Sequence, residues 1–583
     1  MDQPTLPQRS DAPRRAGLRV RAAHWIAARW RRPIRLTVEQ LALVASLYWL
    51  LFCNRVFFGR ALEGANDPAG WIFGAALLVI VLALHFGLLI VLMNRWTARP
   101  LLALLLVVSA FASFYVEHLG VYIDGPMLRN VLHTHPGEAR ELLSWALAGH
   151  VLLYAGVPLL LLSRVRVVRR PLLVSAAMRS LSLSVAVAAI VIAGSVAFQP
   201  LAAFARNHKE LRYTVTPGNW MWASAAALAK ERVVDPGPRR TVAIDAAPGP
   251  AWSADSRPRL LVVVVGETAR AANWGLSGYG RDTTPALARL QVVNFSDVTA
   301  CGTSTEVSLP CMFSIIGRRD FDEERIRRSE SVLHVLARVG AKVQWIDNQA
   351  GCKGVCDGLP TLSAAAAAGT PCDGDCLDDR LVQALDRQIG QLTSGTTIVV
   401  LHMIGEHGPG YFRRYPAGLA RYTPACTEDD LRRCTVGEVV NAYDNAIAFT
   451  DHVLGALIGR LMQSADAVDS GLLFLSDHGE SLGEKRLFLH GVPYRIAPSE
   501  QLKVPMVLWL SQGFAARAGI DLACLRSRAA LPTSHDALPH TLLGLLDVRT
   551  SEYAADLDLS AACRGARPSA SRAPIAASPA VLR

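Results

Sequence analysis

The chain has 583 residues, a mean hydropathy of +0.26 and a formal charge of +11, with 51% hydrophobic and 19% charged residues. Its length is too great for one hydrophobic core, and its hydropathy indicates membrane segments beside a sizeable soluble part. The arginines lie beside apolar runs and are not interleaved with aromatic residues, which argues against a nucleic-acid partner and favours membrane orientation.

The first two hundred residues predict a membrane domain with five spans, each near the 20 or so residues that cross a bilayer. Nine arginines lie within residues 1–35, and no small-residue cleavage site follows them, which predicts a retained anchor. Basic residues recur in 94–99 and 164–170, so the positive-inside rule places the N-terminus and both connections in the cytoplasm. The chain after about residue 200 is then expected outside. The runs cover roughly 37–57, 70–93, 100–117, 142–163 and 180–199.

The loop between the third and fourth runs holds Asn130, Thr134 and Glu138 at i, i+4 and i+8. In a helix these residues would form one polar stripe, which spacing alone explains as a solvated face. Residues 201–232 predict an amphipathic helix at the membrane surface, with Trp220 and Trp222 as interfacial anchors.

The soluble part alternates apolar runs with helical patterns, which predicts a largely parallel sheet covered by helices on both faces. We expect the domains to divide as 1–200 membrane helices, 201–257 bridging helices and linker, 258–564 catalytic domain, and 565–583 disordered tail. The predicted strands are Leu260–Val265, Lys342–Ile346, Thr396–Leu401, Leu472–Leu475 and Val504–Leu510, and the predicted helices are Val332–Arg338, Arg380–Leu392 and Val439–Leu461.

Polar residues follow these strands where ligand sites of such sheets lie, beyond the carboxyl ends. Glu267 follows the first strand, and Asp477 and His478 follow the fourth. The segment from Cys301 to Cys311 holds the hydroxyls of Thr303, Ser304 and Thr305, and Thr305 can add an oxygen to the set. Carboxylates with an imidazole suit Zn²⁺, which would also activate the threonine as a nucleophile. The alternative is a buried, hydrogen-bonded Asp-His pair without metal.

Two further histidines stand beside glycine in loops that flank this site. His407 and His490 are candidates to hold a phosphate or a second metal, or else serve as structural hydrogen bonders. His535 and Asp536 resemble the Asp-His pair, but with Ser534 they predict the cap of a helix over 538–545.

Eight of the eleven cysteines lie between Cys301 and Cys434, a density that indicates an oxidising compartment. The two C-x₃-C pairs could form a four-cysteine zinc site, but disulfides suit this compartment and spacing better. Cys53 is expected as a free, buried thiol in the first span, and the spacing leaves open whether Cys524 pairs with Cys563. The expected bridges are Cys301–Cys311, Cys352–Cys356, Cys372–Cys376 and Cys426–Cys434.

Several ordered motifs resemble those of the lipid A phosphoethanolamine transferases, a family that includes the mobile colistin-resistance enzymes. The likeness runs from the five spans to about residue 564. The motifs are Val-Val-Gly-Glu-Thr-Ala-Arg (264–270), Gly-Tyr-Gly-Arg (278–281), Cys-Gly-Thr-Ser-Thr (301–305) with Ser-Leu-Pro-Cys-Met-Phe (308–313), Gly-Cys-Lys-Gly-Val-Cys (351–356), His-Gly-Pro (407–409), Ser-Asp-His-Gly-Glu-Ser-Leu-Gly-Glu (476–484) and Leu-His-Gly (489–491).

The resemblance implies a five-helix membrane domain joined to an α/β/α sandwich catalytic domain like that of alkaline phosphatases and sulfatases. Thr305, rather than Thr303, would be the nucleophile and a zinc ligand. One zinc is expected, with a second at His407 and His490 as an alternative to these histidines binding the transferred group. The residues implied to complete the site are Glu267, Asp477 and His478 as zinc ligands, Lys353 as a substrate contact, and Asn130, Thr134 and Glu138 in lipid binding.

The implied reaction moves phosphoethanolamine from phosphatidylethanolamine to a lipid A phosphate through a covalent threonine intermediate, lowering surface negative charge and polymyxin binding. The enzyme would be a monomer of the bacterial inner membrane with its catalytic domain in the periplasm. Two carboxylates depart from the family pattern, Glu306 and Glu406. Both would repel phosphate unless Lys353 or metal compensates, or else they would bind the ethanolamine ammonium or an additional cation.

Other activities fit parts of the pattern. The acceptor could instead be a core sugar or a periplasmic glucan, and the same fold serves phosphoglycerol transferases and sulfatases. A sulfatase requires Cys-x-Pro-x-Arg, which Cys311-Met-Phe does not match. A membrane-anchored binding module without catalysis would contain no zinc.

Overall fold

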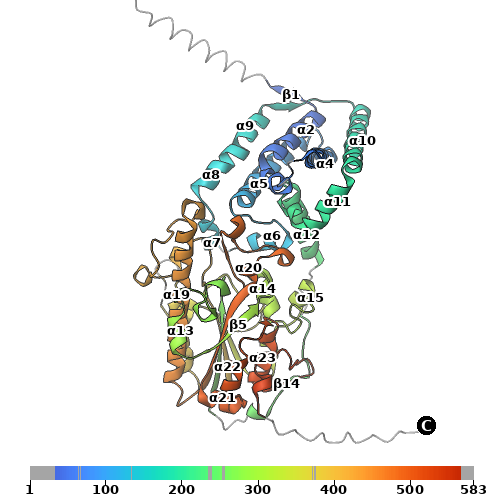
Figure 1. The fold of residues 1–583 in the computed structure, drawn as a ribbon. Helices are drawn as coiled ribbons and strands as arrows, with labels where there is room; N and C mark the ends of the chain where they lie inside the picture. The colour runs from blue at the N-terminus through green and yellow to red at the C-terminus, as the bar shows by residue number, and fades with distance from the viewer. Residues whose placement is uncertain are drawn as a thin grey trace, which may run out of the picture. The chain divides into compact units, whose positions relative to one another are not determined.

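The computed structural model describes residues 33–565, apart from 64, 66, 133, 135, 234–238, 253–256, 371 and 373–375 (Figure 1). The chain forms two compact units, one of Met1–His118 with Trp145–Trp222 and the other of Leu119–Ser144 with Ala223–Arg583. Most of the arginine-rich N-terminus, parts of the expected linker and the expected tail after residue 565 lie outside the described residues. The predicted domain boundaries therefore stay predictions.

The first unit confirms the predicted spans as apolar helices. Four helical stretches are long and apolar enough to cross a membrane, and a pair bent by 64° makes a fifth when counted as one span. The bent pair joins α2 (Val38–Tyr48) and the π-helical turn Trp49–Cys53 to α3 (Arg55–Ala61). The four stretches are α4 (Pro68–Leu92), α5 (Ala98–His118), the run Trp145–Ser163 and α10 (Leu172–Val196). The run Trp145–Ser163 consists of α8 (Trp145–Val151), the π-helical turn Leu152–Gly156 and α9 (Val157–Ser163).

The stretch 201–232, predicted to be amphipathic helix, is largely helical but is divided into two α-helices. The chain forms α11 (Phe198–Asn207), a 3₁₀ turn and α12 (Gly218–Val233), which begins directly after Pro217, a residue that suits the start of a helix and not its interior. Trp220 is half-buried and its indole N–H donates to Ser109 Oγ at 3.4 Å, whereas Trp222 is exposed.

The segment between the third and fourth spans also breaks into two helices, α6 (Gly125–Leu132) and α7 (Pro136–Glu141). Thr134 follows the end of α6, and its hydroxyl donates to the carbonyl of Asn130 at 2.7 Å. The single stripe through Asn130, Thr134 and Glu138 therefore does not form on one helix. The side chain of Glu138 lies outside the described residues.

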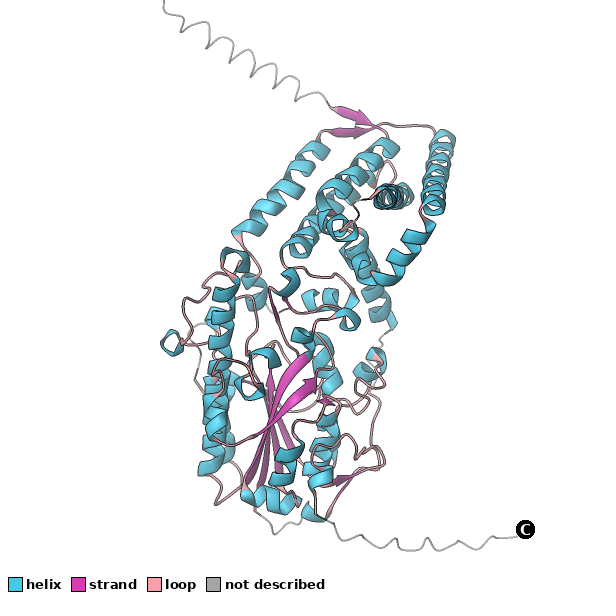
Figure 2. Ribbon diagram, in the orientation of Figure 1, coloured by secondary structure: helices cyan, strands magenta, loops and turns pink. Residues whose placement is uncertain are grey.

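The second unit is an α/β/α sandwich around an eight-stranded sheet, as predicted (Figure 2). The strand order is β13-β5-β12-β9-β4-β8-β6-β7. All eight residues of β4 are buried, and its alternate side chains Leu261, Val263 and Val265 pack into a cluster with residues of α16 (Val332–Arg338) and α23 (Ala537–Leu545). The strands are β4 (Arg259–Gly266), β5 (Val293–Thr299), β6 (Lys342–Asp347), β7 (Thr361–Ser363), β8 (Thr396–His402), β9 (Asp469–Ser476), β12 (Lys503–Leu510) and β13 (Thr533–Ser534).

The sheet differs from the prediction in the direction of one strand and in the added strands β5, β7 and β13. All five predicted strands are present, but β12 runs antiparallel to both β9 and β5. The predicted helices correspond to α16 (Val332–Arg338), α18 (Asp379–Gly390) and α19 (Val436–Gln463). A short helix with no predicted counterpart, α14 (Thr305–Met312), follows β5.

The cap predicted at Ser534–Asp536 is correct in its position but not in its hydrogen bonding. Asp536 stands at the N-cap of α23 (Ala537–Leu545) without a capping hydrogen bond, because its carboxylate instead accepts from the backbone N–H groups of Arg318 and Arg319. His535 connects the segment between Cys301 and Cys311, the cysteine loop, to the sheet. It accepts a hydrogen bond from Cys301 N at 3.1 Å and donates one to Ser476 O at 2.9 Å.

The four expected cysteine pairs are joined as disulfides, and Cys524–Cys563 forms a fifth. Cys53 is free and buried, as expected. Because both C-x₃-C pairs are closed, the described residues hold no four-cysteine zinc site.

Candidate metal centre and active site

Two neighbouring parallel strands bring the candidate ligands together. β4 and β9 pair in parallel with Gly266 opposite Ser476, so the residues that follow each strand meet at one edge of the sheet. These residues are Glu267, Asp477 and His478, all fully buried, and a ligand atom of each lies within 4.8 Å of the others. Their meeting follows from strand register alone, which explains why the sequence could predict it.

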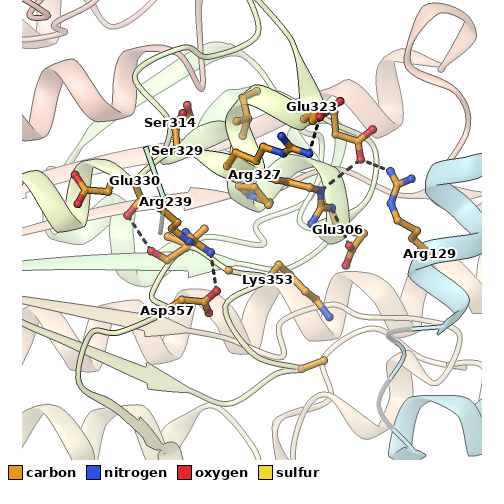
Figure 3. Close-up of a pocket in the computed structure, with 18 residues that line it drawn as sticks. Arg129, Arg239, Glu306, Ser314, Glu323, Arg327, Ser329, Glu330, Lys353 and Asp357 are labelled. Carbon is orange, nitrogen blue, oxygen red and sulfur yellow. Dashed lines mark hydrogen bonds and ion pairs between the residues drawn. The ribbon is translucent and has the colours of Figure 1, made fainter. Parts of the chain in front are cut away.

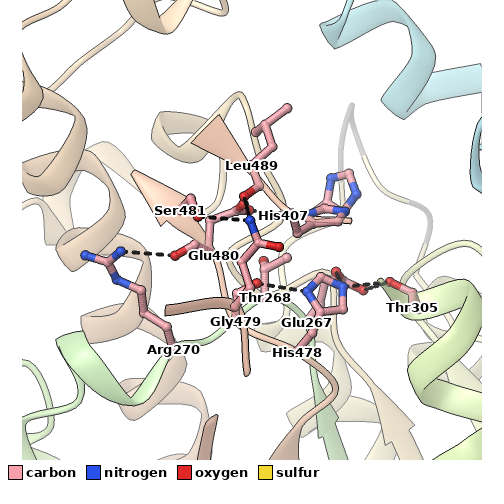
Figure 4. A network of polar contacts seen from close by, with 12 residues as sticks. Glu267, Thr268, Arg270, Thr305, His407, His478, Gly479, Glu480, Ser481 and Leu489 are labelled. Atoms are coloured by element: carbon pink, nitrogen blue, oxygen red, sulfur yellow. Dashed lines mark hydrogen bonds and ion pairs between the residues drawn. The ribbon is translucent and has the colours of Figure 1, made fainter. Parts of the chain in front are cut away.

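The separations between these groups suit a tetrahedral metal. His478 Nε2 lies 3.4 Å from Glu267 Oε1 and 3.4 Å from Asp477 Oδ2. Thr305 Oγ1 donates to Glu267 Oε2 at 2.9 Å and lies 3.3 Å from His478 Nε2 (Figure 4). Ligands about 2.0–2.1 Å from a tetrahedral Zn²⁺ would be about 3.3 Å apart, so the four residues fit that ion.

Hydrogen bonds from the backbone orient the ligand atoms. His478 Nδ1 donates to Gly479 O at 3.0 Å, which leaves the Nε2 lone pair facing the carboxylates. Asp477 Oδ1 accepts from two backbone N–H groups, while its Oδ2 is buried with no hydrogen-bond partner among the described residues. Burial, followed by the charge of His490, lowers the pKa of His478 and keeps the imidazole in the neutral form that binds metals.

Thr305 is the first residue of α14, which follows Ser304 in the cysteine loop. The unpaired N–H groups and positive dipole end of a helix favour an alkoxide or phosphate at this position. The neighbouring hydroxyl is used differently, because Thr303 Oγ1 donates to Val492 O at 2.7 Å. The structure therefore separates the two threonines, which residue chemistry left equivalent: only the Thr305 hydroxyl faces Glu267.

The two flanking histidines stand over the ligand set. The ring of His490 lies 4.4 Å from that of His478 and 5.7 Å from that of His407. Burial, followed by the charges of His490 and Arg414, lowers the pKa of His407, and Lys353 contributes in the same direction. The rings of both histidines therefore lie next to the ligand His478 or to each other, and Lys353 is near enough to His407 to affect its pKa.

Several residues that hold the site in place were not predicted from the sequence. Gln349 Nε2 donates to Glu267 Oε2 at 3.2 Å, and Glu480 holds His490 Nδ1 at 3.4 Å. Tyr443 Oη donates to the carbonyl of Thr268, a β-branched residue with the unfavourable φ of +57°. Glu480 lies inside the Ser-Asp-His-Gly-Glu motif and could have been noticed, whereas Gln349 and Tyr443 give no signal in the sequence.

The segment 119–144 packs against α14 and the loop that carries His490. The backbone N–H of Phe488 donates to Leu119 O at 3.2 Å, and a side chain at Gly491, next to His490, would meet Met127 of α6. Asn130 and Thr134 are thus carried on an element that touches the His490 loop.

Glu406 does not repel phosphate at neutral pH, contrary to the expectation for a free carboxylate. It is fully buried, and Thr450 Oγ1 donates to its Oε1 at 2.6 Å. Burial raises its pKa from 4.5 to about 8. The group is therefore mostly uncharged at pH 7.

Replacing Glu406 by glutamine is expected to remove a pH dependence of stability. The folded-state pKa lies above the unfolded one, so wild type loses stability as pH rises from about 4.5 to 8, by roughly 1.4 kcal/mol per pH unit. Glutamine keeps the acceptor for Thr450 without titrating. Melting midpoints of both proteins between pH 5 and 8.5 should diverge in favour of Glu406→Gln, and a constant difference would contradict the assignment.

Glu306, the second unexpected carboxylate, is neutralised by a chain of ion pairs (Figure 3). Its side chain is 1% exposed, and Arg327 Nη2 donates to its Oε1 at 2.8 Å. Arg327 also lies 3.4 Å from Glu323, which pairs with Arg129 of α6. The residue after Thr305 is thereby linked to the helix that carries Asn130.

These residues line a cavity of about 720 Å³. Lys353 also lines it and has no ion pair among the described residues. Each arginine of the lining forms an ion pair with a carboxylate. The pairs are Arg129–Glu323, Arg239–Asp357, Arg327–Glu306 and Arg328–Glu324. Lys353 is therefore the cation of this cavity that is available to an anionic group.

Replacing Arg327 by methionine is expected to destabilise the protein by about 1–3 kcal/mol, because the buried Glu306 loses its guanidinium. The double variant with Glu306→Ala should recover most of that loss. Arg328→Met is the matched control, since its pair with Glu324 is about half exposed and should contribute little. Unfolding midpoints that shift equally for the two arginine variants would contradict the assignment.

Comparisons with known proteins agree with this geometry. A family model described as Phosphoethanolamine transferase EptA/EptB matches residues 80–232, and a Sulfatase model matches residues 259–548. The fold and the site define a membrane-anchored enzyme with a sulfatase-like domain. The chain is 35% identical over 544 residues to phosphoethanolamine transferase EptA of Escherichia coli K12, covering 90% of this chain and 96% of that protein. The chain belongs to the phosphoethanolamine transferase family.

Two further relatives support the same placement. Phosphatidylethanolamine transferase Mcr-1 of Escherichia coli is 36% identical over 538 residues, covering 88% of this chain and 96% of that protein. The solved structure of the integral membrane protein lipooligosaccharide phosphoethanolamine transferase A from Neisseria meningitidis matches with a TM-score of 0.87 at 34% identity, over 92% of this chain and all of that chain.

Proposed function

We propose that this protein transfers phosphoethanolamine from phosphatidylethanolamine to a phosphate of lipid A, with Thr305 as the nucleophile. The observation that carries the proposal is the hydroxyl of Thr305, which stands at the start of α14 and donates to Glu267 at 2.9 Å. The names of the relatives support the substrates, since they include phosphatidylethanolamine, lipid A and lipooligosaccharide.

Zn²⁺, held by Glu267, Asp477, His478 and Thr305, would supply charge that lowers the pKa of the threonine hydroxyl. The Thr305 oxygen attacks the phosphorus of phosphatidylethanolamine while its proton is directed at Glu267. The bond from phosphorus to the diacylglycerol oxygen breaks, that oxygen takes a proton from water and leaves as diacylglycerol, and phosphoethanolamine remains on the threonine. An oxygen of the acceptor phosphate then attacks the same phosphorus and frees Thr305.

Other residues bind and position the transferred group. His407 and His490, whose rings lie beside that of His478, would donate to oxygens of the transferred phosphate or hold a second zinc. Lys353 offsets negative charge at the cavity wall. Asn130, Thr134 and Glu138 would contact the lipid, which is supported for Asn130 by the contact of its helix α6 with the His490 loop.

We further propose that the protein is a monomer of the bacterial inner membrane, with its N-terminus in the cytoplasm and its catalytic domain in the periplasm. The arginines beside the first, second and fourth spans and the five disulfides both support this orientation.

Mass spectrometry of lipid A tests the acceptor directly. Cells that make wild type should gain phosphoethanolamine on lipid A and bind less polymyxin, whereas cells that make Thr305→Ala should not. Unmodified lipid A together with phosphoethanolamine on core sugar or glucan would show that lipid A is not the acceptor, and would leave the proposed mechanism unchanged. Modified lipid A in the alanine strain would refute the nucleophile.

A further inference from the structure

We propose a second metal site, built from Glu117, His118 and His150, which binds a divalent transition metal such as Zn²⁺ and joins α5 to α8. A ligand atom of each residue lies within 4.8 Å of the others. All three belong to the membrane unit, and none is a residue of the proposed catalytic centre. The site is therefore independent of the proposed transferase function.

Hydrogen bonds within the membrane unit leave one nitrogen lone pair on each imidazole. His118 Nδ1 lies 2.9 Å from Phe114 O, and because a carbonyl only accepts, Nδ1 carries the proton and Nε2 the lone pair. His150 Nε2 lies 3.1 Å from Ser113 Oγ, whose own proton is donated to Ala110 O at 3.2 Å. His150 Nε2 then carries a proton, and its Nδ1 has the lone pair. Metal-binding histidines are oriented by bonds of this kind.

Stacking holds both rings in place. Phe114 stacks on His118 with ring centres 4.2 Å apart, and Tyr154 stacks on His150 with ring centres 4.1 Å apart and planes 4° from parallel. The two imidazoles lie 5.7 Å from each other. Rings that are already ordered lose little rotamer freedom when a metal binds.

The carboxylate completes a ligand set typical of zinc. Glu117 lies 3.6 Å from Arg55, whose side chain is 60% exposed, so this pair costs little to exchange for a metal. Two imidazoles and a carboxylate bind Zn²⁺ at about 2.0–2.2 Å and leave a fourth position for water.

The position of the ligands suggests what the metal would do. His118 is the last residue of α5, and His150 lies in α8, so the pair brackets the segment 119–144 in sequence. A metal bound to both would fix the ends of the segment that carries Asn130 and Thr134. We infer a structural clip, which stabilises the protein by binding the folded state.

The test uses full-length protein in detergent, without a histidine tag, in which Glu267→Gln weakens the catalytic centre. After equilibration with Zn²⁺ and removal of free metal, this background should retain about one equivalent more zinc than the same protein carrying His118→Asn and His150→Asn. The matched control is His452→Asn, an exposed histidine of α19 that should change nothing.

A second measurement keeps the test valid if the triple variant is damaged. With chelator present, the melting midpoints of background and triple variant should agree, and added Zn²⁺ should raise only the former. Equal zinc content, or an equal rise with zinc in both proteins, would overturn the proposed site, as would a single His150→Asn variant that keeps both properties.

Discussion

Thr305→Ala is expected to lower transfer by at least about 10⁴-fold, because the variant lacks the oxygen that would attack phosphorus. The fold should remain, since alanine suits the start of a helix and the side chain is small. Transfer from a fluorescent phosphatidylethanolamine by purified full-length protein measures the rate, and the melting midpoint checks the fold.

Two threonine variants sharpen this test. Thr305→Ser keeps a hydroxyl beside Glu267 and should retain measurable transfer. Thr303→Ala removes the hydrogen bond to Val492 and should lower the rate far less than Thr305→Ala. A Thr305→Ala protein with more than a few per cent of wild-type transfer would show that another group is the nucleophile.

The second large effect is expected for Glu267→Gln. The neutral amide removes a charge from the ligand set and the acceptor of the Thr305 proton, so zinc affinity and transfer should each fall by at least about 100-fold. Metal analysis and rates at increasing Zn²⁺ measure both quantities. Excess zinc should restore only part of the rate, because the amide of the variant cannot accept the proton as a carboxylate does.

Glu480→Gln is the control that separates the loss of a buried negative charge from the loss of a zinc ligand. Glu480 is equally buried but contacts His490 and not Thr305, so this variant should keep its zinc while transfer falls less. Equal loss of zinc in both variants would contradict the assignment of Glu267 as a ligand. A wild-type rate that survives complete zinc removal would contradict a metal-dependent reaction.

The parallel centre of the sheet could be predicted because its strands are continuous apolar runs. The meeting of Glu267 with Asp477 and His478 followed from that sheet, since neighbouring parallel strands end at one edge. The antiparallel direction of β12 could not be predicted, because an apolar run has the same pattern in a parallel and in an antiparallel strand. β5 was missed because its burial alternates and it contains Asn294 and Asp297.

Contacts between distant residues decide what the sequence could not. In the sequence, Glu306 is an unexplained negative charge beside the nucleophile. In the structure, Arg327, which lies 21 residues further along the chain, pairs with it. Glu406 looks like a second unexplained charge until its burial and its bond to Thr450 are known. Neither partner is signalled by spacing or motif.

Mass spectrometry of the protein itself tests the covalent intermediate most directly. Full-length protein incubated with phosphatidylethanolamine in the absence of acceptor should gain the mass of one phosphoethanolamine group, and fragmentation should place it on Thr305. Addition of lipid A should remove it. No added mass, or the same mass on the Thr305→Ala protein, would contradict Thr305 as the nucleophile that carries the transferred group.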